Sequence, residues 1–400
     1  MNKTLVFILV TLVIDAMGIG LIMPVMPALL REIGGIPLAD AALVGGLLST
    51  VFAVMLFLCG PLIGSLSDRY GRRPVLLLSL FVLAVDYIIM ALAQTFWLLF
   101  IGRIIGGVAS ATQATATAVI ADISEPEEKA ARFGLVGAAF GLGFVLGPMI
   151  GGVLAEYGTR APFFAAAALA ALNMAFGFFV MPETVTDRTR RAFSWKRANP
   201  LGAFKHVSLN PQIRPLLFMF LLYQIAFFVY PIIWSYFATA RFEWSESTIG
   251  LSLAFFGISM ALVQGGLIRV ILKWLGDRGT VLYGLVFSIV SFLFLAFVTE
   301  GWLALAFTPV TALGAVVTPA LQGILSKATS DDSQGELQGV LSSISALAMI
   351  LSPMVMSSVF ARFAAEDAAI YLPGAPFLVS AGLMLACIFV FLPTMRPAQA

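Results

Sequence analysis

The stretch Gly64-Ser-Leu-Ser-Asp68-Arg69-Tyr-Gly71-Arg72-Arg73-Pro74 is a short charged link between two long apolar runs, 42–66 and 74–93. A helix of about 20 apolar residues is long enough to cross a bilayer, and both runs meet that length. Lipid offers no hydrogen bonds to a turn, so the link is expected at the water interface. The pattern predicts a hairpin of membrane-spanning helices.

Similar runs fill most of the 400 residues. Hydrophobic residues make up 60% of the chain and charged residues 11%, which is too little charge for the surface of a soluble protein. The first run has no cleavage site before the next polar stretch, so it is expected to be a retained span. This predicts an all-α integral membrane protein with twelve transmembrane helices, at 5–30, 42–66, 74–93, 96–121, 131–157, 161–181, 213–240, 248–274, 280–298, 302–327, 336–362 and 374–394.

The charged residues indicate an orientation. The N-terminus, the polar segment 182–212 and the C-terminus are placed on one side, because this arrangement gathers most of the 23 Lys and Arg residues there. The basic residues left on the other side are Arg31, Arg160, Arg241 and Arg362. By the positive-inside rule, both termini are predicted to be cytoplasmic.

The two halves of the chain repeat each other. Residues of the same type recur 205 positions apart at Gly45 and Gly250, Gly60 and Gly265, Gly71 and Gly276, Arg73 and Arg278, Gly134 and Gly339, and Pro148 and Pro353. We expect six-helix bundles at 1–181 and 213–400, a cytoplasmic linker at 182–212, and a central cavity. This pseudo-symmetric plan is typical of alternating-access transporters. A receptor or a membrane-embedded enzyme is the alternative from another class.

The charged link contains residues suited to a gate. Asp68 could accept hydrogen bonds from the N-terminus of a neighbouring helix, where the helix dipole favours an anion. Arg72 could pair with Asp122 at the cytoplasmic end of the fourth span. Such pairs would close the cytoplasmic side in one state and break in the other. The alternative is a basic anchor with a Gly-Pro turn.

Three ionisable residues lie inside predicted spans, where a charge costs several kcal/mol. Asp15 lies near mid-depth of the first span. Asp86 and Arg103 lie at similar depth in the membrane, on the third and fourth spans, which form a hairpin. We predict that the two aspartates carry a coupling proton and that Arg103 modulates them. The alternative for Asp86 and Arg103 is a buried pair that only fixes the hairpin.

The charged link resembles the signature loop of the major facilitator superfamily. The fifth span, Gly137 to Gly152, resembles the glycine motif of its drug/proton antiporter branch, with Gly147 and Pro148 as the expected flexible point. A glycine stripe that serves only packing is the other interpretation. The resemblance implies a proton-driven exporter in the inner membrane of a bacterium, working as a monomer without a cofactor.

The first span, Asp15-Ala-Met-Gly18-Ile-Gly20-Leu-Ile-Met-Pro24-Val-Met-Pro27, and Gln334-Gly-Glu-Leu-Gln338-Gly339 are similar to the bacterial tetracycline-efflux proteins. In that family the matching aspartates are implicated in transport. The histidine of its eighth span and the aspartate of its ninth correspond here to Met260 and Ser288. Tetracycline travels as a chelate with a divalent metal, so any metal is expected to arrive with the substrate. Because Met260 and Ser288 replace those two residues, the alternative function is a multidrug exporter or an exporter of a metabolite, such as a sugar or siderophore.

Polar and aromatic side chains predict where a flat amphipathic substrate binds. The aromatic residues of the seventh span recur every three or four positions, as on one helix face. Core packing, lipid contact and an interfacial belt are the alternatives for these aromatics. The candidates are Thr112, Gln113, Tyr223, Gln224, Phe227, Tyr230, Trp234 and Gln264. With one histidine and two cysteines inside apolar runs, neither a metal site nor a disulfide framework is expected, and no nucleic-acid partner.

Overall fold

The computed structural model describes residues 3–110, 112–125, 127–187, 190–195, 199, 213–330 and 333–395, and this part of the chain holds helices and loops without a β-strand. Eleven segments are long and apolar enough to cross a membrane. One of them, Glu246–Phe297, has 52 residues and is interrupted at Gly276, whose φ is 65° and ψ 177°. It is long enough for two crossings, so the prediction of a twelve-span all-α protein is confirmed.

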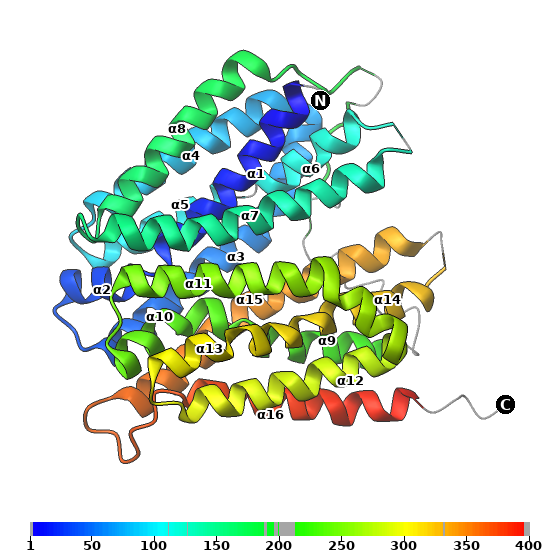
Figure 1. Cartoon of the computed structure of the whole chain (residues 1–400). Helices are drawn as coiled ribbons and strands as arrows, with labels where there is room; N and C mark the ends of the chain where they lie inside the picture. Colours follow the sequence, from blue (N-terminus) through cyan, green and yellow to red (C-terminus); the bar gives the residue numbers. More distant parts are fainter. Residues whose placement is uncertain are drawn as a thin grey trace. The chain divides into compact units, whose positions relative to one another are not determined.

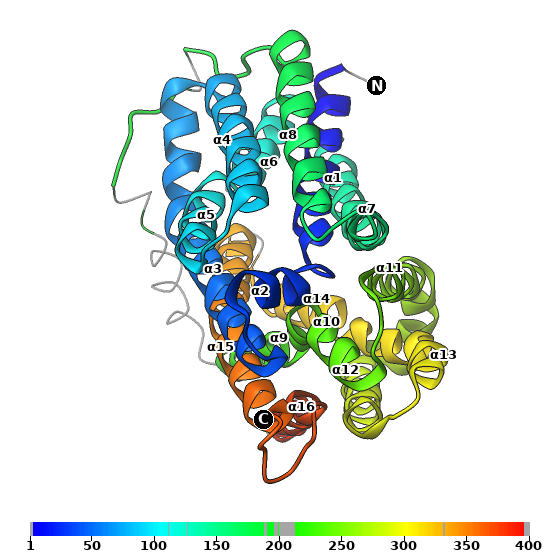
Figure 2. The ribbon, with the colours of Figure 1, turned by 90° about the vertical axis from the view of Figure 1, so that its left-hand side faces the viewer.

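The first compact unit comprises residues 1–36, 51–200 and 245–254. Helix α1 packs against α7 and α8, and α4 packs against α8 and α5. Figure 2 shows α4, α8, α1 and α7 following one another across this unit. Its helices are α1 (Lys3–Ile22), α2 (Met26–Gly34), most of α3 (Leu38–Tyr70), α4 (Arg72–Leu92), α5 (Phe96–Ala109), α6 (Thr112–Asp122), α7 (Lys129–Ala155), α8 (Ala161–Val180) and the start of α11 (Glu246–Leu262).

The second unit comprises residues 37–50, 201–244 and 255–400. Helix α16 packs against α9 and α12, and α15 packs against α9 (Figure 1). Of the predicted linker 182–212, residues 188–189, 196–198 and 200–212 lie outside the described residues. The remaining elements are α9 (Arg214–Phe227), α10 (Val229–Phe242), η2 (Val263–Leu267), α12 (Ile268–Phe297), α13 (Gly301–Ala312), η3 (Leu313–Val316), α14 (Val317–Lys327), α15 (Gln334–Ala364), α16 (Ala375–Phe391) and η5 (Leu392–Met395).

Several predicted continuous spans are broken in the structure. The first divides into α1 and α2 near Pro24, the fourth into α5 and α6 at Ser110, and the seventh into α9 and α10 at Phe228. Pro231 explains the last break, because it has no N–H to bond the carbonyl of Phe227 four residues earlier. The eighth and tenth spans contain a π-helical turn, η2, and a 3₁₀ turn, η3.

The distribution of apolar side chains suits a protein surrounded by lipid. In the first unit, Phe7 and Leu12 of α1 pack with Leu76 and Leu80 of α4 in a buried cluster. Large apolar side chains elsewhere, such as that of Phe179, are exposed instead. Exposed apolar side chains on many helices are costly in water but ordinary against lipid.

Candidate functional site

Asp15 lies on α1 beside the break between α5 and α6. The Thr112 hydroxyl, on the first residue of α6, donates a hydrogen bond of 2.5 Å to Oδ2 of Asp15. The other carboxylate oxygen, Oδ1, is buried and has no hydrogen-bond partner among the described residues. The structure therefore joins two predicted site residues, one assigned to proton coupling and the other to substrate binding.

Asp86 lies on α4 and is 1% exposed. Arg103 of α5 lies beside it, with Nη2 4.0 Å from Oδ2, too far for a hydrogen bond. Within the described part of the chain, neither carboxylate oxygen of Asp86 has a hydrogen-bond partner. A Cβ on Gly106 of α5 would collide with this carboxylate at 2.5 Å, and one on Gly102 would be in tight contact with it at 3.0 Å, so the two glycines make room for it.

Arg103 is held by weak partners. Its Nη2 donates to the Met90 sulfur, and its guanidinium lies 5.4 Å from the centre of the Phe52 ring. The Nε of Arg103 is buried without a partner among the described residues. The predicted pair of Asp86 and Arg103 is thus brought together without a direct hydrogen bond, and both groups keep bonding capacity for a new partner.

The charged turn begins where α3 ends. Gly71 has φ 110°, a conformation that favours glycine, and α4 starts at the next residue. Arg72 Nη1 lies 2.6 Å from Oδ1 of Asp68, and its Nε donates to Oδ2 of Asp122 over 3.2 Å. Arg72 also donates to the Ser67 hydroxyl over 2.7 Å. The three predicted gating residues therefore form one connected cluster.

Sequence reasoning missed Glu183, which lies just after α8. Its carboxylate accepts from the backbone N–H groups of Arg72 and Arg73 at the start of α4, over 2.9 and 3.2 Å. It also accepts from its neighbours Thr184 and Val185. Glu183, and not Asp68, therefore fills the place predicted for an anion at a helix N-terminus. An acidic residue directly after the sixth span, on the side of the charged turn, was the signal available in the sequence.

A stripe of glycines on α7 faces α1. A Cβ on Gly147 would lie 2.6 Å from the carbonyl oxygen of Met17 and 2.9 Å from Cα of Gly20. Gly143 and Gly151 approach the α1 backbone in the same way. The stripe therefore packs two helices closely, as small residues do in membranes. The neighbouring proline does not break α7, which continues from Lys129 to Ala155.

The predicted aromatic face of the seventh span packs against other aromatic rings in the structure. The rings of Tyr223 and Phe227 stack with centroids 5.7 Å apart. The Tyr223 hydroxyl donates to the Gly314 carbonyl over 3.2 Å. Tyr230 is buried among rings from α11, α12 and α16, and Trp234 is also buried. Tyr230 and Trp234 are thus packed inside the second unit, and their contact with a ligand stays a prediction.

The polar candidates are more varied. Gln224 donates to the Ser345 hydroxyl over 3.2 Å, and Gln264 in the π-helical turn donates to the Ala315 carbonyl in the 3₁₀ turn over 3.2 Å. Gln113 is exposed in the first unit. Gln113 is therefore the predicted substrate residue whose side chain is least committed to contacts in the structure.

Comparison with known proteins identifies the family. The family model described as "Major Facilitator Superfamily" matches residues 8–353 and 216–400. The chain belongs to the major facilitator superfamily. The resemblance that the charged link and the fifth span carry is thereby confirmed, and the chain is a membrane transporter of this superfamily.

Within the superfamily, the chain is 40% identical over 395 residues to the class C tetracycline resistance protein of Escherichia coli, covering 99% of this chain and 97% of that protein. The crystal structure of the human organic anion transporter MFSD10 matches 97% of this chain and 99% of its own, with a TM-score of 0.70 and 26% identity. The nucleoside transporter NupG matches in fold, with a TM-score of 0.80 at 15% identity over 99% of this chain and 100% of its own.

Ser288 stands where the resemblance to tetracycline exporters led us to expect the ninth-span aspartate, and it is tightly packed. Ser288 of α12 is buried, and a side chain on Gly314 of the 3₁₀ turn would collide with its hydroxyl. A larger carboxylate would therefore not fit here without rearrangement. Among the described residues, no group of three or more His, Cys, Asp or Glu side chains could hold a metal ion.

Proposed function

We propose that this chain is a proton-coupled exporter of amphipathic drugs in the inner membrane of a bacterium, with tetracycline as the leading substrate. The identity to the class C tetracycline resistance protein over nearly the whole chain supports the substrate class. The positive-inside distribution of Lys and Arg supports cytoplasmic termini. In the proposed cycle, substrate enters from the inner side and leaves outward. One copy of the chain supplies both repeats and is sufficient for this cycle.

The buried carboxylate of Asp86 is the observation that carries the proposed proton coupling. A charge at this depth without hydrogen-bond donors is costly, and binding a proton removes the charge. The Arg103 guanidinium 4.0 Å away can compensate the anion if it moves closer. Proton binding and release at Asp86 would therefore change the position favoured by Arg103.

Asp15 is proposed as the second proton carrier. Its single described bond, from the Thr112 hydroxyl, joins α1 to the start of α6. A hydroxyl can donate to a carboxylate or accept from a protonated acid, so the contact survives either state. Thr112 is thereby proposed to pass the state of Asp15 to the broken fourth span, where Gln113 faces the substrate.

The cluster of Arg72, Asp68 and Asp122 is proposed as a gate on the cytoplasmic side. It ties the end of α3, the start of α4 and the end of α6 through one guanidinium. These charges are partly exposed, so their pairing energy is modest and the cluster can break during transport. Close packing at Gly147 keeps α1 and α7 together while the gate changes.

The proposal is tested by tetracycline uptake into everted membrane vesicles, with and without magnesium and with an imposed pH gradient. Asp86→Asn and Asp15→Asn should each abolish gradient-driven uptake while leaving the amount of folded protein unchanged. Asp40→Asn, at an exposed position on the first turn of α3, is the matched control and should transport normally. Normal gradient-driven uptake by both buried variants would refute the proton-coupling assignment.

The buried Ser288 of the ninth span and Met260 of the eighth favour a second candidate, an exporter of other drugs or of a metabolite. A metal chelate of tetracycline prefers carboxylate partners, and these two positions supply none. Growth inhibition across a panel of drugs, with and without expression of the chain, separates the candidates. Protection against many apolar drugs but not against tetracycline would replace the leading substrate and keep the exporter.

A further inference from the structure

The turns before the third and ninth spans share an unusual backbone feature. Gly71 has φ 110° and Gly276, which lies 205 positions later, has φ 65°. Side chains other than glycine rarely adopt such angles, so the two positions serve the same role in their repeats. The internal repeat is therefore present in the backbone of both turns.

At the three positions of the Arg72 cluster the charges are inverted 205 positions later, whereas Arg73 keeps its sign as Arg278. In the first unit, Arg72 pairs with Asp68 and Asp122. The residues 205 positions later are Asp277, Lys273 and Lys327. Only 11% of the chain is charged, so charged residues at all three corresponding positions exceed what chance gives, and all three carry the opposite sign.

The central inverted pair is formed in the structure. The Lys327 ammonium contacts Oδ2 of Asp277, which joins the end of α14 to the part of α12 that follows Gly276. Arg72 and Asp122 join the start of α4 to the end of α6 at the matching points of the first unit. Each pair thus links the two consecutive spans of its own repeat.

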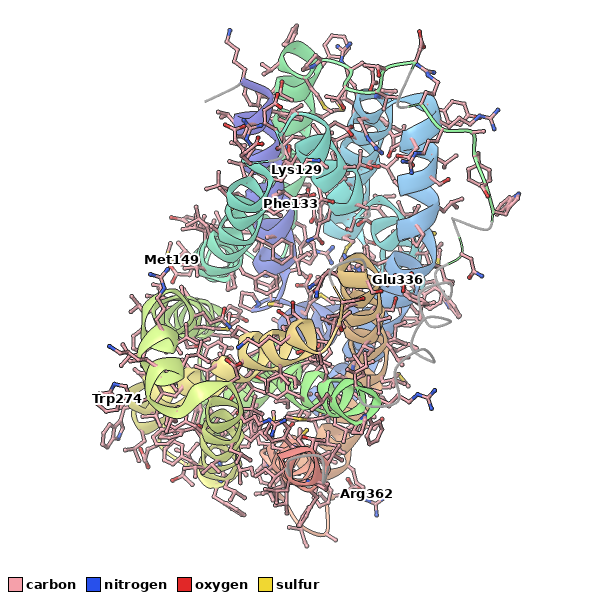
Figure 3. The ribbon with its side chains drawn as sticks, turned by 90° about the vertical axis from the view of Figure 1, so that its right-hand side faces the viewer. Lys129, Phe133, Met149, Trp274, Glu336 and Arg362 are labelled. Atoms are coloured by element: carbon pink, nitrogen blue, oxygen red, sulfur yellow. The ribbon has the colours of Figure 1, made fainter. Side chains whose placement is uncertain are left out.

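An exposed aromatic residue marks the depth of the second pair. Trp274 precedes Gly276 on α12 and is 80% exposed, and Figure 3 shows it projecting from the helix. Tyr70, just before Gly71, is also exposed. Such aromatic residues favour the boundary between lipid and water. A charge pair at this boundary is less hydrated than one in bulk water, which strengthens it.

We propose that Asp277 and Lys327 are positioning residues of a second cytoplasmic gate, a charge-inverted copy of the cluster around Arg72. This inference rests on the proposed transport function. The pair holds the ninth and tenth spans together in one state and releases them in the other. Because each side chain only needs a partner of opposite charge, exchanging the two residues should preserve the gate.

The test uses Asp277→Lys, Lys327→Asp and the double exchange, with Glu366→Lys in the exposed loop after α15 as the control for added charge. Initial rates of tetracycline uptake are measured in everted vesicles at equal protein. Each single variant should lower the maximal rate about fivefold or more, because a like-charged pair replaces the ion pair. The half-saturating concentration should stay unchanged, and the double exchange should recover at least half of the rate.

Hydrogen exchange of the amides at the end of α14 gives a second measurement that needs no substrate. Exchange should become faster in each single variant and return to the original rate in the double exchange. Single variants with unchanged exchange, or a double exchange no better than the singles in both measurements, would overturn the proposal. If the parent protein transports no drug but the variants show this exchange pattern, the proposed function is refuted and the coupling between Asp277 and Lys327 remains supported.

Discussion

Replacing Gly147 by alanine tests the packing of α7 against α1. The added Cβ would lie 2.6 Å from the Met17 carbonyl oxygen and 2.9 Å from Cα of Gly20, where ordinary contacts are 3.4–4 Å. Both neighbours are backbone atoms, so no change of rotamer relieves the collision. The two helices would have to separate by roughly 0.5–1 Å, and contacts along the stripe would weaken.

The expected cost follows from two opposing terms. Overpacking a close contact costs about 1–3 kcal/mol. Alanine is favoured over glycine in a helix by up to about 1 kcal/mol, which offsets part of that cost. We expect Gly147→Ala to lose roughly 1–2 kcal/mol. Gly141→Ala is the matched control on the same helix, because its Cβ would meet no described atom within 4 Å, and it should be neutral or slightly stabilising.

The assay heats the detergent-purified variants and follows the loss of monodisperse protein by size-exclusion chromatography. The midpoint should fall for Gly147→Ala and stay the same or rise for Gly141→Ala. Equal midpoints for both variants would refute the packing argument. An unchanged midpoint with lost export in Gly147→Ala would instead favour a flexible point beside Pro148.

Three further outcomes follow from the described contacts. Arg72→Lys should lower export severalfold although the charge is kept, because an ammonium lacks the fork that reaches two carboxylates; uptake in everted vesicles measures this. Glu183→Gln should lower the thermal midpoint by the equivalent of about 0.5–2 kcal/mol, because the start of α4 loses its charged cap, and an unchanged midpoint would contradict that role. The Thr159 hydroxyl, and then Arg160, hold the pKa of Glu32 below its usual value. Ionised Glu32 therefore stabilises the folded protein fully above its unfolded pKa of about 4.3. This stabilisation is lost as pH falls through the lower pKa of Glu32 in the folded protein. The parent protein should therefore have a higher thermal midpoint than Glu32→Gln, by the equivalent of less than about 1 kcal/mol for this half-exposed pair. The difference should shrink below about pH 4, and a difference that grows there would contradict the assignment.

Much of the first unit's polar arrangement could be predicted because sequence spacing determines it. Asp68 and Arg72 are four positions apart, and Asp122 ends the span that returns to the same side. Asp86 and Arg103 lie at similar depth on either side of one short link. In such hairpins the chain length limits which residues can meet, so the pairs follow from the positions of the spans.

The contacts of Glu183 could not be predicted in the same way. Its partners are backbone N–H groups, which every residue except proline carries, so the position of Glu183 after the sixth span marks a possible anion but not which groups it bonds. The helix break at Phe228 could not be predicted from hydropathy either, because the apolar run continues through it. Only Pro231 signals a missing backbone hydrogen bond. Backbone partners and helix breaks depend on the neighbouring helices as well as on local sequence.

The seventh span shows why helical periodicity alone does not distinguish a binding surface from a packed face. Tyr223, Tyr230 and Trp234 recur at the spacing of one helix face, as predicted, but this face is buried against other aromatic rings. A face toward the bundle core, a cavity or lipid has the same period in a membrane helix. Only the position of the surrounding helices distinguishes these environments.

The ionisable residues inside the predicted spans lie in the first unit, whereas the π-helical and 3₁₀ turns lie in the second. Asp15, Asp86 and Arg103 place ionisable groups inside the first unit, whereas the bond from Gln264 to the Ala315 carbonyl in the second unit joins neutral groups. Neutral amides do not titrate, so this bond cannot carry the proton, and the proposed proton step is assigned to the aspartates of the first unit. The same glutamine bond connects the π-helical and 3₁₀ turns, and such turns mark places where helices can change register. We therefore infer that the second unit responds to the proton step by rearranging these turns, and that a carboxylate at position 288 is unnecessary for this response.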